Sequence, residues 1–321
     1  MGWVREVKIQ DPESKIPNEA KMALAGRKYV YLTPEAVSRF ENMELRARGI
    51  VEGFMTGLHK SPHHGFSVEF AEYREYVPGD PIRHIDWNVL ARTDHVVIRQ
   101  YEQETNLRAT VILDRSKSLD FKATSPITKF EYGCYTAAAL IYMLSRQQDA
   151  VGLVTHADTI DKVFPPRASA MAVREMLLHL EACRPSGRTG LAEVYHEIAE
   201  RLPRRSLVIL ITDLFDNQDA VASALRHFRH RRHEVLLFHL LDDVELNFPY
   251  RGLIEFRDLE TGQRMEVEAE LLRDAVSAAV REFVQSYRKV CGDARIDYHL
   301  LNTSEPFDNA LAAYLARRMS A

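Results

Sequence analysis

The chain has 321 residues, which corresponds to about two domains of ordinary size. Its composition, 46% hydrophobic and 27% charged, is typical of a globular protein with a buried core. The net charge of −4 provides no bulk attraction to nucleic acid or to an anionic membrane, so we expect neither as a partner. No apolar run reaches the roughly 20 residues that a membrane-spanning helix needs, and the N-terminus lacks the apolar core of a signal peptide.

The three cysteines, Cys134, Cys183 and Cys291, lie far apart in the sequence. Their odd number and wide spacing fit neither a disulfide framework nor a cysteine metal site. We therefore expect small, buried packing residues and a reducing, cytoplasmic location.

The first 106 residues predict a tail, a helix and a small β-rich subdomain. Residues 1–28 are polar without an apolar period, and we expect a loosely ordered tail. Thr33-Pro34 indicates the start of a helix that ends near Gly53 or Gly57, because a hydroxyl caps a helix and proline suits its first turn. The turn signal Pro-Gly-Asp-Pro at 78–81 divides short runs that end in a strand at 96–100. We assign residues 29–106 to the helix and this subdomain.

From residue 107 the pattern alternates between apolar runs and helical stripes, and we assign 107–321 to a second domain. The expected strands are 110–113, 150–155, 207–211, 235–241 and 296–301, and the expected helices are 130–144, 171–180, 191–202, 220–231, 272–287 and 309–318. Because these strands are apolar on both faces, they predict an α/β fold with a doubly wound, mostly parallel sheet. Short alternating runs at about 248–268 predict a β-hairpin insertion.

Oxygen-bearing side chains follow the first strand of this domain. Asp114, Ser116 and Ser118 occupy alternate positions directly after the apolar run that ends at Leu113. Carboxylate, hydroxyl and water oxygens are the ligands that Mg²⁺ prefers. The pattern therefore predicts one ligand loop of a Mg²⁺-type site at the carboxyl edge of the sheet.

Two later segments complete the predicted site. Asp213 follows the strand 207–211, and Thr189 precedes the helix that begins near Gly190. We expect one divalent ion, Mg²⁺ or else Mn²⁺ or Ca²⁺, bound by Asp114, Ser116, Ser118, Thr189 and Asp213. Few carboxylates and several neutral oxygens would leave water positions that an incoming acidic group could fill. The alternative is that each of these residues only caps a turn or a helix.

The order Asp-x-Ser-x-Ser, Thr, Asp resembles the metal-ion-dependent adhesion site of von Willebrand factor A domains. Further segments resemble the domain-of-unknown-function family 58, and the likeness covers about residues 30–318. These segments are 65–69, 73–80, 83–87, 91–93, 101–105, 149–153 and 231–245. The resemblance implies a doubly wound sheet, a divalent ion and genomic association with MoxR-type AAA+ ATPases, but no known reaction. Arg188 departs from the pattern, since many A domains carry glycine there.

We therefore predict a non-catalytic, metal-dependent protein-binding module. It would act as an adaptor or co-chaperone of a MoxR-type AAA+ ATPase, with an acidic protein ligand on the ion. One alternative is a Mg²⁺-dependent hydrolase or phosphatase with Asp114 as nucleophile, and another is a purely structural scaffold. The chain has no phosphate-binding loop of the Gly-x-x-x-x-Gly-Lys-Ser/Thr type, so we expect no ATP hydrolysis by the chain itself.

Four groups of charged residues allow two interpretations each. The basic run from Arg226 to His233 suits a solvated helix end or a phosphate contact. The acidic segment Asp242–Glu245 suits a solvated loop or additional charge near the metal. The residues Asp80, Arg83, Asp86, Trp87 and Arg92 suit an internal network or a partner-binding face. Lys117 and Arg115, which flank the serines, would weaken binding of the ion or help to hold an acidic partner.

Overall fold

The computed structural model describes residues 7–9, 33–59, 73–75, 97–99, 107–257, 259 and 263–320. The chain divides into two compact units. One contains Met1–Met55 together with Leu107–Ala321, and the other contains Thr56–Asn106. In the second unit, strand β2 (Tyr73–Glu75) pairs antiparallel with β3 (Val97–Arg99).

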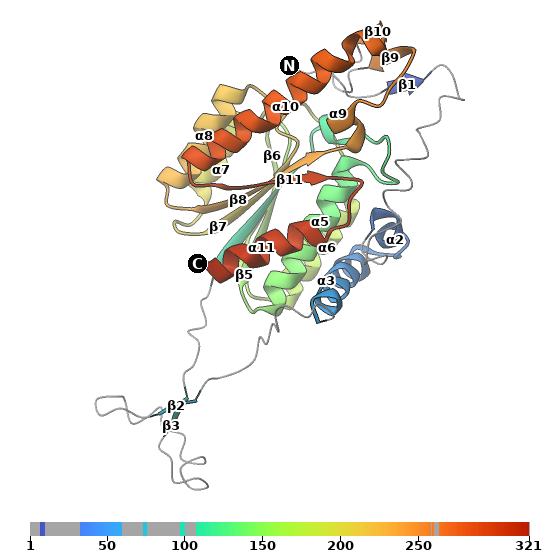
Figure 1. Ribbon diagram of the computed structural model, residues 1–321. Helices are drawn as coiled ribbons and strands as arrows, with labels where there is room; N and C mark the ends of the chain where they lie inside the picture. The colour runs from blue at the N-terminus through green and yellow to red at the C-terminus, as the bar shows by residue number, and fades with distance from the viewer. Residues whose placement is uncertain are drawn as a thin grey trace. The chain divides into compact units, whose positions relative to one another are not determined.

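A six-stranded sheet forms the centre of the first unit (Figure 1). Its strands, in spatial order, are β11 (Asp297–Asn302), β8 (Glu234–Leu241), β7 (Leu207–Thr212), β4 (Arg108–Asp114), β5 (Ala150–His156) and β6 (Ile160–Arg167). All neighbours are parallel except β5 and β6. The predicted doubly wound, mostly parallel α/β sheet is therefore confirmed.

Strand β6 at the edge of the sheet was not predicted. Most of its side chains are exposed or half-buried, and it contains Pro165 and Pro166. Proline cannot donate to a neighbouring strand and is tolerated at an edge. Because its side chains are mostly exposed, this strand lacks the apolar run that identified the other five strands.

Helices cover both faces of the sheet (Figure 1). One face carries α5 (Lys129–Arg146), α6 (Ala170–Ala182) and α11 (Asp308–Ser320), and the other carries α7 (Leu191–Arg201), α8 (Gln218–His230) and α10 (Ala269–Asp293). The core of the second face joins Tyr195, Phe228 and Tyr287 to strand residues such as Ile112 and Val208. Burial of such large apolar side chains contributes about 1.5–3 kcal/mol each.

Helix α5 fixes the geometry at the carboxyl edge of the strands. It begins in a capping box, in which the Thr128 hydroxyl accepts from the Glu131 amide and the Glu131 carboxylate accepts from the Thr128 amide. Gly133 lies so close to the sheet that a Cβ atom would be 3.1 Å from Leu113 and 3.3 Å from Leu240. This close packing places the first helical residue, Lys129, beside the ends of β4, β7 and β8.

The predicted N-terminal helix is divided in two. Helix α2 (Pro34–Ser38) begins with Thr33 as its cap, as expected, and α3 (Met43–His59) follows after a break. The Asn42 side chain accepts from the Leu45 amide and starts the second helix. Asparagine competes in this way with continued helix, and this local capping explains the division.

The predicted hairpin is present as β9 (Leu253–Arg257) and β10 (Arg264–Glu268). Strand β1 (Val7–Ile9) pairs antiparallel with β9. The prediction of a loosely ordered tail is therefore wrong at these three residues. A small apolar cluster that includes Phe248, Ile254 and Phe256 supports the hairpin and the short helix α9 (Asp243–Asn247).

Several predictions concern residues outside the described part of the chain. These are most of the β-rich subdomain and the charged cluster Asp80, Arg83, Asp86, Trp87 and Arg92. Within the described ranges, no helix is both long enough and apolar enough to cross a bilayer. The three cysteines are free and buried, as expected.

Candidate metal centre

The predicted carboxylates lie at the same edge of the sheet. Asp114 ends β4, and Asp213 follows β7. The two strands are parallel neighbours, with Leu113 paired to Ile211. The chain leaves β4 toward β5 on one side and later returns to β7 on the other, so this edge is a topological switch point, where open α/β sheets bind ligands.

Asp114 is fully buried and held by two hydrogen bonds. Its Oδ1 accepts from the Ser116 amide at 2.8 Å, and its Oδ2 accepts from the Thr212 hydroxyl at 2.8 Å. Burial, followed by the negative charge of Asp213, raises the pKa of Asp114 to about 7. The second cause means that two like charges lie close together in a dry setting, where repulsion is strong.

The three predicted hydroxyls form one chain of contacts. Ser116 Oγ and Ser118 Oγ are 2.8 Å apart, and Thr189 Oγ1 lies 3.5 Å from Ser118 Oγ. Both serines are fully buried, whereas Thr189 is half-buried. The short helix η3 (Lys117–Leu119) curves the loop so that the two serines face each other.

A buried lysine accompanies Asp213, and the sequence did not reveal it. Lys129 Nζ donates to Asp213 Oδ2 at 3.1 Å and to Glu245 Oε1 at 2.9 Å. All three side chains are at most 3% exposed. Burial alone would lower the pKa of Lys129, but the charges of Glu245 and Asp213 outweigh it and hold that pKa above its ordinary value. Lys129 is therefore an ammonium group.

The charges of this cluster do not balance. Asp114, Asp213 and Glu245 are three carboxylates, and Lys129 provides one positive charge. Burial, only partly offset by Lys129, raises the pKa of Glu245 to about 7. When all three carboxylates are ionised, two negative charges are uncompensated. Together with the three hydroxyl oxygens, they fit a hard divalent cation in both charge and donor type.

Neighbouring residues hold Asp213 in place. His239 on β8 lies 3.0 Å through Nε2 from the Asp213 carbonyl and 2.7 Å through Nδ1 from the Tyr298 hydroxyl. A carbonyl only accepts, so Nε2 carries the proton and Nδ1 accepts from Tyr298. Burial lowers the pKa of His239 to about 3, and this ring is therefore neutral.

Arg115 organises the loop that carries Thr189. It pairs with Asp161 at 2.8 Å and donates to Ser186 Oγ at 2.6 Å and to the Arg184 carbonyl at 3.1 Å. This cation therefore does not face an incoming partner. Lys117 and Arg188, by contrast, are exposed.

The sequence model of the family described as "Protein of unknown function DUF58" matches residues 72–285. The chain belongs to the DUF58 family. It is 27% identical to the uncharacterized protein Rv1480 of Mycobacterium tuberculosis over 267 residues, which are 81% of this chain and 82% of that protein.

This DUF58 protein is similar to several solved structures at low sequence identity. BatB from Bacteroides thetaiotaomicron, a conserved hypothetical protein, matches with a TM-score of 0.47 and 15% identity over 67% of this chain and all of that chain. The SpRpn10 VWA domain matches with a TM-score of 0.36 and 12% identity over 64% of this chain and 94% of that chain. The strand order itself establishes the doubly wound, mostly parallel sheet.

The structure of the DUF58 protein links Asp114, Ser116, Ser118 and Thr189 through successive contacts and places Asp213 after the neighbouring strand. It adds Lys129 and Glu245 beside Asp213. Glu245 lies on α9, and of the two interpretations of its acidic segment, additional charge near the site is the correct one. The sequence does not predict that Lys129 is buried, because this residue follows an ordinary helix cap. Its only sequence signal is its place at the start of the helix after the Asp-x-Ser-x-Ser loop.

Glycine at position 187 gives a first testable prediction. Its φ is +81°, and a Cβ atom would lie 2.9 Å from Ala157 Cβ. Gly187→Ala should destabilise the protein by about 2–3 kcal/mol, since it adds a clash to backbone strain. Gly252→Ala is the matched control, because φ is +71° there and nothing lies within 4 Å. Urea denaturation measures the free energy of unfolding of both variants. An equal loss of this free energy in the two variants would contradict a rigid loop at residue 187.

Proposed function

We propose that this DUF58 protein is a non-catalytic binding module that holds an acidic group of a protein partner through one divalent cation. The observation that carries the proposal is a cluster of three buried carboxylates with one lysine, adjacent to three linked hydroxyls at a switch point. Asp114, Ser116, Ser118, Thr189 and Asp213 would hold Mg²⁺, Mn²⁺ or Ca²⁺. The ion would supply positive charge and open positions for oxygen ligands.

The exposed surface supports an acidic partner. Thr189 is the half-buried member of the five, so access to the ion would be from its loop. Lys117 and Arg188 are exposed on the two loops that meet there, where the Lys117 amide donates to the Gly187 carbonyl at 3.3 Å. Two exposed cations would attract a carboxylate and disfavour basic ligands.

The family resemblance supports a particular class of partner. We propose that the chain serves a MoxR-type AAA+ ATPase in the cytoplasm as an adaptor or co-chaperone for assembling other proteins. The family resemblance supports the ATPase, and the three free thiols support a reducing compartment. The ATPase would provide the mechanical work and this chain the recognition.

The hydrolase alternative has less support. A phosphoryl-transfer site needs a metal-bound electrophile and a base of suitable pKa. His156 at the end of β5 is paired in register with Asp114, and burial lowers its pKa to about 4, which makes it a weak base. Turnover of a phosphoester that is lost in Asp114→Asn would restore this alternative.

A capture experiment tests the binding function. Tagged wild-type chain should retain partner proteins from its native cells in Mg²⁺ and release them in EDTA, and Asp114→Ala should retain none. Asp219→Ala is the control, because Asp219 is an exposed carboxylate on α8. Unchanged capture of the same proteins by Asp114→Ala would remove the proposal.

A further inference from the structure

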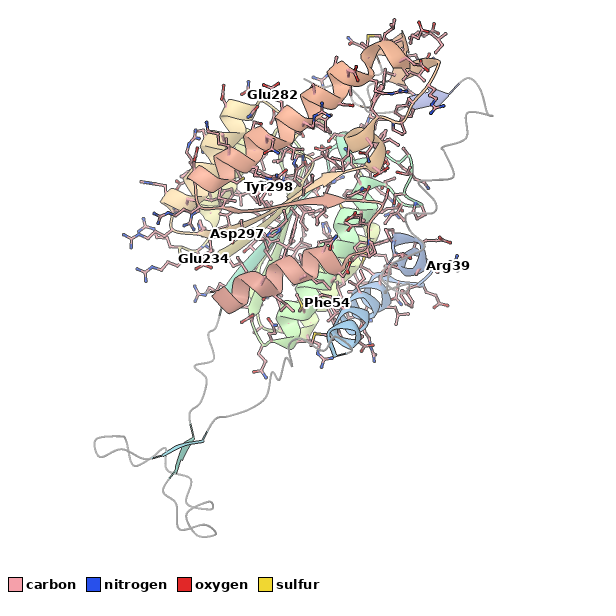
Figure 2. The ribbon with its side chains drawn as sticks, in the orientation of Figure 1. Arg39, Phe54, Glu234, Glu282, Asp297 and Tyr298 are labelled. Atoms are coloured by element: carbon pink, nitrogen blue, oxygen red, sulfur yellow. The ribbon has the colours of Figure 1, made fainter. Side chains whose placement is uncertain are left out.

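A basic hollow lies at the opposite edge of the sheet from the metal centre. It has a volume of about 560 Å³, within the usual range of small-molecule sites. Two turns line it, one between α7 and β7 and the other between α8 and β8. Its residues are Glu200, Arg204, Arg205, His227, His230, Arg231 and Arg232. Figure 2 shows several nitrogen-tipped side chains beside Glu234, where β8 begins.

The lining carries an excess of positive charge. Glu200 is its one carboxylate and is already engaged, by Arg231 at 3.0 Å and by His227 at 2.9 Å. Arg204, Arg205 and Arg232 pair with no carboxylate among the described residues. Four guanidinium groups against one carboxylate leave three positive charges, and the C-terminal ends of α7 and α8 offset about half a charge each. About two positive charges remain uncompensated.

Two structural features distinguish these arginines. Arg231 Nη2 also donates to the Glu200 carbonyl at 3.1 Å, which fixes the α8 turn to the end of α7. Arg205 and Arg232 both occupy left-handed backbone conformations, with φ of 59° and 66°. Glycine or asparagine is favoured in this conformation, so an arginine there costs free energy and is a candidate for a role in binding.

We propose that this hollow binds an anion with two or more linked phosphates, either inorganic polyphosphate or a nucleoside polyphosphate. Guanidinium groups bind phosphate oxygens in a bidentate manner. A chain of phosphates carries at least the two negative charges that would neutralise the excess positive charge of the lining. The lining comes from only two adjacent turns and the ends of α7 and α8, and such a compact site favours a small anion over a nucleic acid strand. This inference is independent of the proposed function at the metal centre.

Calorimetry with inorganic triphosphate tests the proposal. Triphosphate chelates Mg²⁺, so binding is measured at fixed free Mg²⁺ in the wild type and in Asp114→Ala, and both should bind equally. Arg204→Gln and Arg232→Gln should each weaken binding about tenfold, since each removes a charge-assisted contact. Arg201→Gln should stay within twofold, because Arg201 pairs with Glu197 outside the hollow.

Three further ligands distinguish the source of the phosphates. ATP that binds as well as triphosphate indicates that only the phosphates are recognised, and ATP that binds at least tenfold tighter indicates a nucleotide. Adenosine should not bind in either case. Absence of triphosphate binding, loss of binding in Asp114→Ala, equal loss in Arg201→Gln, or tighter binding of a single-stranded RNA 12-mer than of triphosphate would overturn the proposal.

Discussion

Replacing Lys129 by methionine should destabilise the metal-free protein by about 3–5 kcal/mol. Methionine has a similar length and no charge, so the main loss is the ammonium group between Asp213 and Glu245. Removal of one partner of a buried ion pair leaves an uncompensated charge, which costs far more than the loss of a surface pair. Lys129 is 1% exposed, and solvent therefore cannot replace the missing charge.

The same variant tests the charge balance of the proposed site. Without Lys129, a divalent cation would take over the neutralisation of Asp213, so Mg²⁺ should stabilise Lys129→Met more than it stabilises the wild type. Urea unfolding with Mg²⁺ and with EDTA measures both effects. Lys122→Met is the control, because Lys122 is exposed. A loss below about 1 kcal/mol in EDTA would show that Lys129 is not required to neutralise its carboxylates.

The central sheet could be predicted because its strands are buried on both faces. Runs such as Leu207–Ile211 have no alternative interpretation as solvated segments, and helical stripes between them imply parallel crossovers. The antiparallel strand β6 and the three residues of β1 could not be predicted in this way. Their pairing depends on neighbours distant in the sequence, and neither has a strong apolar pattern of its own.

The residues of the candidate site also differ in whether the sequence predicts them. Asp114 and Asp213 each follow a predicted strand, so their common edge depended only on which strands are neighbours. Lys129 and Glu245 reach that edge from the starts of two helices, and their burial results from tertiary packing. A single sequence does not show that a lysine after a helix cap faces inward. The charge of the site was therefore the part that sequence reasoning left incomplete.

Asp114→Ala should abolish the stabilisation that Mg²⁺ provides. A ligand that binds only the folded state adds RT ln(1 + [L]/Kd) to the free energy of unfolding. This amounts to about 2.7 kcal/mol when the ligand concentration is one hundred times Kd. The Asp114 carboxylate lies at the centre of the proposed ligand set, between the Ser116 amide and the Thr212 hydroxyl. Thermal unfolding across a Mg²⁺ titration should show a rising midpoint in the wild type and a flat one in the variant.

The effect without metal separates coordination from general stability. Asp114→Ala relieves repulsion with Asp213 but leaves the Ser116 amide and the Thr212 hydroxyl without their acceptor, and these two effects oppose each other. The metal-free variant should therefore change by less than about 2 kcal/mol, so loss of the Mg²⁺ response would not reflect unfolding. Asp219→Ala, which alters an exposed carboxylate, should keep the full response. If the Asp114 variant keeps it as well, the ion binds elsewhere or only to the surface.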